Sequence, residues 1–164
     1  MLDRDLKNGK ILIVDDKHAN IELLVEVLHC EGYSNLKTTT DPRKVLGIIK
    51  KFEPDLILLD LKMPALSGFD VMELIKKERH NSLNPNKYLP ILVLTADSSQ
   101  PIKLRALAAG AKDFLSKPFD IREVEFRIKN LLETQYLFQL MQEKHQTLEE
   151  KVISFLKFND EWYK

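Results

Sequence analysis

The segment KILIVDDKHAN, Lys10 to Asn20, decides the fold of this chain. Its four consecutive apolar residues, Ile11 to Val14, are typical of a strand that is buried on both faces in a parallel sheet. The run ends directly at two adjacent carboxylates, Asp15 and Asp16. Two negative charges at the tip of such a strand indicate a site at that end of the sheet. We therefore expect the acid pair to face this site rather than to be buried.

The alternation of apolar runs with helical periodicity extends over most of the sequence. Further strands are predicted at Leu56–Leu59 and Ile91–Leu94, with weaker candidates at Asn35–Thr39 and Phe114–Leu115. The segments between them repeat apolar residues every three or four positions, as amphipathic helices do. Asp41-Pro42 predicts a helix start, while Gly32 and Gly110 predict helix ends. Repeated strand–helix alternation predicts an α/β fold with a doubly wound, five-stranded parallel sheet.

Composition narrows the class of protein. The chain has 164 residues and a formal net charge of zero, so nothing indicates a nucleic-acid partner. No apolar run approaches the roughly 18–20 residues of a membrane helix, and the first residues do not resemble a signal peptide. The single cysteine, Cys30, cannot form an internal disulfide. We therefore predict a cytoplasmic protein.

The C-terminal third predicts one long helix, because no proline or glycine follows Pro118. Asp120 and Glu123 form a capping-box pattern at its start. Two apolar seams with 3-4 spacing follow. The first comprises Ile121, Val124, Ile128, Leu131, Gln135 and Phe138; the second comprises Met141, His145, Leu148, Val152, Phe155 and Trp162.

The first seam can pack on the sheet, whereas the second needs a partner helix. We predict a two-stranded coiled coil over Glu133–Phe158. The alternative is a helix that folds back on its own domain. The segment from His80 to Tyr88, rich in Asn and Pro, predicts an exposed loop.

Polar residues follow the predicted strands where ligands bind in open α/β sheets. Asp60 follows the third strand, Thr95 the fourth and Lys117 the fifth. Clustered carboxylates repel one another unless a cation neutralises them, and oxygen-only ligands suit Mg²⁺. Lys117 is expected to pair with Asp60. A hydroxyl and an ammonium group beside a carboxylate that binds Mg²⁺ are suited to phosphoryl transfer, with the carboxylate as nucleophile.

Four motifs in this order and spacing resemble the receiver domain of two-component response regulators: ILIVDD, DLILLDLKMPALSG, ILVLTA and AKDFLSKPF. The resemblance covers Lys10 to Leu131 and implies a flavodoxin-like sheet of strand order 2-1-3-4-5. It divides the chain into an N-terminal tail (1–9), a receiver domain (10–132) and a coiled-coil extension or linker (133–164).

The resemblance implies roles for the site residues. Asp60 is the implied phosphoacceptor, Thr95 hydrogen-bonds the phosphoryl group and Lys117 pairs with it, followed by Pro118 after a cis peptide bond. The implied Mg²⁺ ligands are Asp15, Asp16, Asp60 and the backbone carbonyl of Lys62.

Three further positions carry implied regulatory roles. Phe114 occupies the position of an aromatic switch residue, which here would act by packing because it lacks a hydroxyl; the alternative is a permanently buried ring. Lys62 and Asp97 lie where side chains tune the lifetime of the acyl phosphate. We hypothesise that Lys62, paired with Asp97 or placed on the phosphoryl oxygens, hinders the attacking water.

The resemblance implies a signalling switch, enzymatic only toward its own phosphorylation and dephosphorylation. The expected partners are a sensor histidine kinase or phosphotransfer protein and a second copy joined through the C-terminal helix. This helix resembles linkers that precede cyclic-di-GMP domains of the HD-GYP and GGDEF kinds. Either the sequence is a piece of such a regulator, or the coil itself is the output of a stand-alone adaptor.

Two other functions stay open at this point. A phosphatase of the haloacid-dehalogenase type would need an Asp-x-Asp motif after the first strand, but Lys17 stands two residues after Asp15. A receiver-like protein that only binds partners is disfavoured because every site residue is present.

Overall fold

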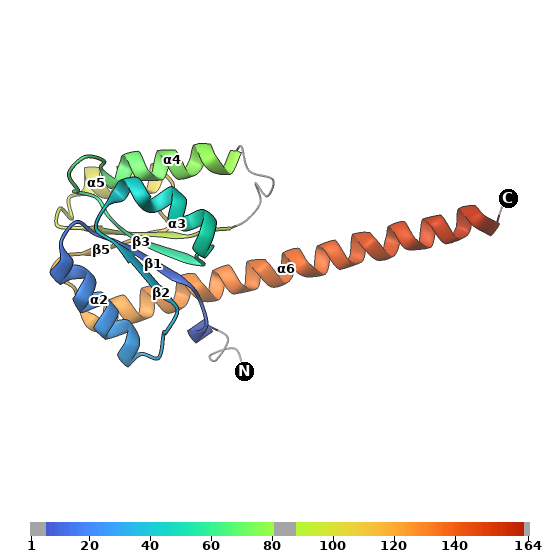
Figure 1. Ribbon diagram of the computed structural model, residues 1–164, viewed down its shortest axis with the longest axis horizontal. Coiled ribbons are helices and arrows are strands. Elements are labelled where there is room, and N and C mark those ends of the chain that lie inside the picture. Colours follow the sequence, from blue (N-terminus) through green and yellow to red (C-terminus); the bar gives the residue numbers. More distant parts are fainter. Residues whose placement is uncertain (1–5, 81–87, 163–164) are drawn as a thin grey trace.

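The computed structural model describes residues 6–80 and 88–162, with side chains described as far as residue 157. A five-stranded sheet in the order β2-β1-β3-β4-β5 forms its centre (Figure 1). All four strand pairings are parallel. The strands are β1 (Ile11–Val14), β2 (Leu36–Thr39), β3 (Leu56–Asp60), β4 (Ile91–Thr95) and β5 (Asp113–Ser116). The predicted fold class and strand order are confirmed.

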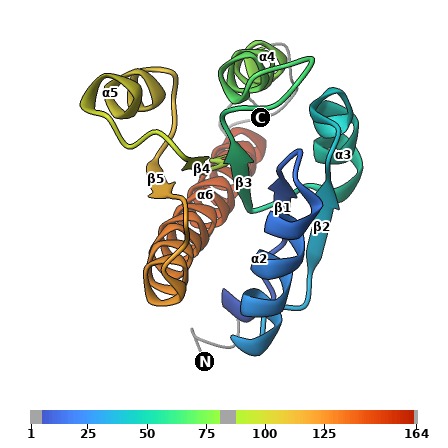
Figure 2. The same cartoon turned by 90° about the vertical axis from the view of Figure 1, so that its left-hand side faces the viewer.

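Helices cover both faces of the sheet, as Figure 2 shows. On one face lie α2 (His18–Cys30) and the start of α6 (Ile121–Trp162). The opposite face is covered by α3 (Val45–Phe52), α4 (Gly68–His80) and α5 (Gln100–Ala108). Side chains of β1 alternate between the two cores, which is why its sequence is apolar without interruption.

Strand and helix boundaries differ slightly from those predicted. The ladder extends β3 to Asp60 and β4 to Thr95, so both polar residues are the last residues of strands rather than the residues after them. The Asp41 carboxylate accepts the Arg43 N–H at 3.0 Å and starts a short 3₁₀ helix, η1 (Pro42–Lys44), that leads into α3. Gly32 and Gly110 have positive φ angles of 88° and 108° at the ends of α2 and α5, which confirms both predicted helix ends.

The domain core begins before the predicted boundary at Lys10. Leu6 was expected in an N-terminal tail, but its side chain is buried in the core beside α2 and α6. The domain core therefore recruits a residue from before β1. Of the loop predicted from His80 to Tyr88, His80 is the last residue of α4, and residues 81–87 lie outside the described part of the chain.

One uninterrupted helix, α6, forms the C-terminal third, as predicted. Asp120 caps it by accepting the N–H groups of Arg122 and Glu123 at 2.9 and 3.1 Å. The Glu123 carboxylate, expected to complete a capping box, pairs instead with the Arg127 guanidinium at 2.7 Å. Half of the predicted capping box is therefore replaced by an ion pair within the helix.

The first apolar seam of α6 packs on the sheet with two changes. Val124 is the first buried residue of the helix, while Ile121 is 56% exposed because it precedes the segment that contacts the core. Leu132 rather than Leu131 is fully enclosed. Beyond residue 140 the helix projects away from the domain (Figure 1), and within residues 6–80 and 88–162 no helix is apolar enough over sufficient length to span a membrane.

Candidate functional site

Three carboxylates gather where β1 and β3 end. Ligand oxygens of Asp15, Asp16 and Asp60 lie within 4.8 Å of one another. Asp15 is fully buried and Asp60 is 4% exposed. Parallel strands point their carboxyl ends to one edge of the sheet, so residues far apart in sequence meet there, as predicted.

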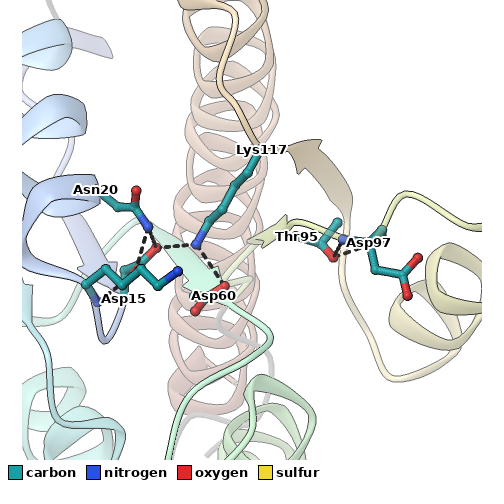
Figure 3. Close-up of polar contacts among 7 residues, drawn as sticks. Asp15, Asn20, Asp60, Thr95, Asp97 and Lys117 are labelled. Carbon is teal, nitrogen blue, oxygen red and sulfur yellow. Dashed lines mark hydrogen bonds and ion pairs between the residues drawn. The ribbon is translucent and has the colours of Figure 1, made fainter.

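Lys117 bridges two of these carboxylates (Figure 3). Its Nζ lies 2.6 Å from Asp15 Oδ2 and 3.0 Å from Asp60 Oδ1. Burial acts to lower the pKa of Lys117, but its hydrogen bonds to both carboxylates outweigh burial and raise that pKa above its usual value. The amine is therefore held as a cation. The expected pairing of Lys117 with Asp60 is present. The shorter contact, to Asp15, was not predicted from the sequence.

The expectation that both acids face the site without burial is wrong for Asp15. Its side chain is inaccessible, and several donors hydrogen-bond its carboxylate. The Lys17 N–H donates to Asp15 Oδ1 at 2.9 Å, and Asn20 Nδ2 lies 3.1 and 3.0 Å from the two carboxylate oxygens. Together with Lys117, these donors replace the hydration that burial removes.

Asn20 was missed by the sequence reasoning. It lies in the first turn of α2, where the turn after β1 brings its amide back over Asp15 (Figure 3). The sequence does contain a signal for this role: Asn20 is a polar residue in the first turn of the helix that follows Asp15 and Asp16.

The environment of Asp60 changes its acidity. The pKa of Asp60 is raised to about 6. Burial is the largest cause, the Lys117 ammonium opposes it, and the neighbouring Asp15 and Asp16 add to the rise. Asp16 Oδ1 is buried and has no hydrogen-bond partner among the described residues. A buried acceptor left without a donor, in a set of oxygen-only ligands, is the arrangement that a hard divalent cation would complete.

Thr95 lies at the same edge but is bonded to its own loop. The hydroxyl accepts the Asp97 N–H at 3.0 Å and donates to the Asp97 carbonyl at 2.9 Å. Figure 3 shows it separated from the Lys117 pair, pointing toward the β4–α5 loop. The side chain is buried, and a change of partner would break both of its hydrogen bonds to Asp97 in this loop.

Lys62 and Asp97 are near one another without pairing directly. The Asp97 carboxylate accepts the Ser99 N–H at 2.9 Å, and this hydrogen bonding lowers the pKa of Asp97, with a smaller contribution from the charge of Lys62. In the described ranges 6–80 and 88–162 the two side chains form no ion pair. The pairing we hypothesised between them is therefore absent in this conformation, and Lys62 is exposed.

Phe114 is half-buried between two cations rather than enclosed. Lys103 Nζ of α5 lies 4.5 Å from the ring centroid, and Arg127 Cζ of α6 lies 5.7 Å from it. A hollow of about 510 Å³ opens between Thr95 and Phe69 on the same side of the sheet. The ring thus contacts side chains of both α5 and α6.

The sequence matches the family model of the response regulator receiver domain over residues 11–129. The chain belongs to this family. It is 36% identical over 131 residues to the transcriptional regulatory protein YvrH of Bacillus subtilis, an alignment that covers 80% of this receiver chain and 52% of YvrH. The chain spans about half the length of the curated relatives it matches.

Solved receiver structures agree with this assignment. The chemotaxis protein CheY4 of Vibrio cholerae is 27% identical with a TM-score of 0.66, covering 76% of this chain and 98% of that one. The receiver domain of the Francisella response regulator 1452 is also 27% identical, with a TM-score of 0.67 over 77% of this chain and 98% of that one. The predicted family is confirmed.

Proposed function

We propose that this receiver accepts a phosphoryl group on Asp60 from a histidine kinase or phosphotransfer protein, in a reaction that requires Mg²⁺. The observation that carries the proposal is the placement of Asp60: a buried carboxylate at the end of β3, hydrogen-bonded by Lys117 and adjacent to two more carboxylates. Receiver domains act as signalling switches, and this geometry supports that role here.

The residues present fit a Mg²⁺ ion. Asp15, Asp16 and Asp60 supply closely spaced oxygens, and the unpartnered Asp16 Oδ1 lacks a donor that a cation would replace. We propose these three side chains and the backbone carbonyl of Lys62 as the protein ligands, with Asp16 the more direct of the first two. When bound, Mg²⁺ supplies positive charge to the oxygens of the transferred group.

The chemistry of this chain's own residues follows. A carboxylate oxygen of Asp60 attacks phosphorus, the bond between phosphorus and the donor's leaving atom breaks, and the leaving group departs with the electron pair. Lys117 stays protonated and neutralises charge on the product beside Asp15. Ionised Asp60 is the nucleophile; its pKa is raised to about 6 without a bound cation, and Mg²⁺ would lower that pKa and favour the ionised form.

The switch follows from the two alternative partners of Thr95. Its hydroxyl is bonded to Asp97 here, and a phosphoryl group on Asp60 would offer stronger, charged acceptor oxygens. Moving the hydroxyl toward them releases the Asp97 loop and the start of α5, next to the Phe114 ring. We propose that this two-state change is transmitted through α6 in a homodimer joined by its projecting half.

Two alternatives are proposed for the output that α6 controls. Either α6 connects to a further domain, such as a cyclic-di-GMP enzyme of the HD-GYP or GGDEF kind, or its coil docks onto another protein. The phosphatase alternative is disfavoured by the structure of Asp15, the acid after the first strand. Both of its oxygens accept hydrogen bonds and it is inaccessible, which makes it a poor nucleophile.

The test is intact-mass spectrometry after incubation with acetyl phosphate and Mg²⁺. Wild type should gain one phosphoryl group, and Asp60→Asn should gain none. Asp16→Asn should react far more slowly at the same Mg²⁺ concentration, whereas Cys30→Ser should react normally. Modification of Asp60→Asn, or steady turnover of phosphate monoesters by wild type, would contradict the proposal.

The lifetime of the acyl phosphate tests the proposed role of Lys62. If Lys62 hinders the attacking water, Lys62→Ala should speed autodephosphorylation severalfold, and Asp97→Ala should change the rate as well. Lys76→Ala, an exposed lysine on α4, is the matched control. An unchanged decay rate in Lys62→Ala would remove that residue from the tuning role.

A further inference from the structure

The projecting half of α6 carries an exposed apolar seam with a strict register. Met141 is 70% exposed, Leu148 62% and Phe155 64%, each one heptad apart. Val152 is also exposed, and His145 completes the 3-4 spacing between Met141 and Leu148. In heptad notation Met141, Leu148 and Phe155 are d positions, while His145 and Val152 are a positions.

This seam lies beyond the part of the helix that the domain covers. Gln135 is the last fully buried residue of α6, and Phe138 stacks on Tyr88 of the same domain at 5.2 Å between ring centroids. Every residue described from 141 to 157 is exposed. From Met141 to Phe155 the seam is about 21 Å long at 1.5 Å per residue.

Charges beside the seam distinguish the possible orientations of a second helix. Lys144 and Lys151 occupy g positions, and Glu149 occupies an e position. In a parallel, in-register pair, each g residue faces the e residue five positions later on the other helix. Lys144 would therefore face Glu149 of the second copy, and twofold symmetry gives this attraction twice.

The antiparallel arrangement that aligns the same seam is repulsive. Matching Met141 with Val152 and His145 with Leu148 of the second copy brings g positions together and e positions together. Lys144 then faces Lys151, and Glu149 faces its own equivalent. The two attractive Lys144–Glu149 pairs of the parallel dimer are therefore replaced by like-charge contacts in the antiparallel dimer.

His145 adds a second, independent constraint. A polar residue at a single a position costs stability but favours two strands in a fixed register, because it meets its own equivalent instead of an apolar side chain. In the parallel pair His145 faces His145 of the second copy, flanked by Met141, Leu148 and Lys144 of that copy. Glu149 of its own helix lies 3.4 Å from its Nδ1.

We propose that the second copy of this chain binds through a parallel, in-register coiled coil in which His145 fixes the register and Lys144 pairs with Glu149 across the interface. The inference rests on the proposed homodimer and adds its orientation, register and specificity residues. Both receiver domains then lie at the same end of the coil. Because the seam is only about two heptads long, the dimer should be weak and concentration-dependent.

Charge exchange tests the pairing by sedimentation equilibrium on the full chain. Lys144→Glu and Glu149→Lys should each weaken the dimer about tenfold, since each creates two like-charge contacts. An equimolar mixture of the two variants should dimerise as tightly as wild type, because both contacts between unlike chains are attractive. A mixture no tighter than either variant alone would overturn the parallel register.

His145→Ile should tighten the dimer about tenfold and broaden the distribution toward larger oligomers. Gln146→Ile, the same residue one position outside the seam, should leave affinity unchanged. Equal effects of the two variants would remove His145 from the interface.

A disulfide test separates the register from the existence of the dimer. In a Cys30→Ser background, Val152→Cys should cross-link rapidly under mild oxidation, and Ser154→Cys on the outer face should not. A wild-type chain that is monomeric at all concentrations would defeat the proposed homodimer itself. A dimer without the Val152→Cys cross-link would defeat only the parallel register, and neither result bears on phosphorylation of Asp60.

Discussion

Lys117 lies closer to Asp15 than to any other residue of the site, with 2.6 Å between Nζ and Oδ2. Asp15 is inaccessible to solvent, so Lys117 neutralises a charge that water cannot reach. Breaking a buried ion pair by removing one partner leaves an uncompensated charge. This lysine therefore contributes to stability as well as to the proposed chemistry.

Lys117→Ala should destabilise the domain by about 3 kcal/mol, because Asp15 would retain, among the described residues, only the Asn20 amide and the Lys17 N–H as donors. Urea unfolding in the presence of a chelator measures the change. Lys62→Ala, an exposed lysine near the site, should stay within about 0.5 kcal/mol of wild type. A loss in Lys117→Ala no larger than that of Lys62→Ala would contradict the compensating role.

Asp60 should make stability depend on pH. Its pKa is about 6 in the folded protein, against an ordinary value of 3.8, so the folded state holds the proton more tightly than the unfolded state. Stability should therefore fall as pH rises from about 4 to about 6 and stay low above that. Asp60→Asn avoids this loss and should be more stable than wild type by about 2 kcal/mol at pH 7.5 without divalent cations.

The difference between the two proteins should shrink toward zero near pH 4, where Asp60 is protonated. Added Mg²⁺ should stabilise wild type at pH 7.5 more than Asp60→Asn, because the variant lacks one proposed ligand. A difference that does not vary with pH would show that Asp60 has an ordinary acidity.

Phe114 connects two helices through its ring faces, between Lys103 of α5 and Arg127 of α6. Phe114→Leu keeps most apolar contacts but removes both cation–π contacts, so it should cost about 1–2 kcal/mol. Lys103→Met keeps the aliphatic stem and removes one cation, so it should cost less.

The same ring is proposed to transmit the conformational change. NMR shifts of α6 amides that beryllofluoride induces should therefore be smaller in Phe114→Leu than in wild type. If the shifts of the α6 amides are the same in Phe114→Leu as in wild type, the Phe114 ring does not take part in the proposed conformational change.

The sequence predicts the fold well because burial on both faces makes β1, β3 and β4 continuously apolar. The acidic cluster was predictable for a related reason: parallel strands bring their carboxyl ends to one edge. Local spacing alone could not show which acid is buried. The burial of Asp15 depends on Asn20 and Lys117, and the second of these lies 102 residues away.

Gln135 shows the same limit within α6. Its position in the first seam was predicted, but its partner was not, since Asp55 is 80 residues earlier in the chain. The side chain is 2% exposed, and its Nε2 donates to Asp55 Oδ1 at 3.3 Å. Gln139 donates to the same oxygen at 3.3 Å, while the Lys10 N–H donates to the other at 2.9 Å.

These contacts join α6 to the residue that precedes β3, the strand whose last residue is Asp60. Gln135→Leu or Gln139→Leu alone should cost about 1 kcal/mol, because the other amide still satisfies Asp55 Oδ1. The double variant leaves that oxygen without a side-chain donor and should cost about 3 kcal/mol, more than the sum of the single losses. A double-mutant cycle by urea unfolding measures the coupling, with Gln142→Leu on the exposed part of the helix as control. Simple additivity would mean that the two amides act independently and that Asp55 does not anchor the helix to β3.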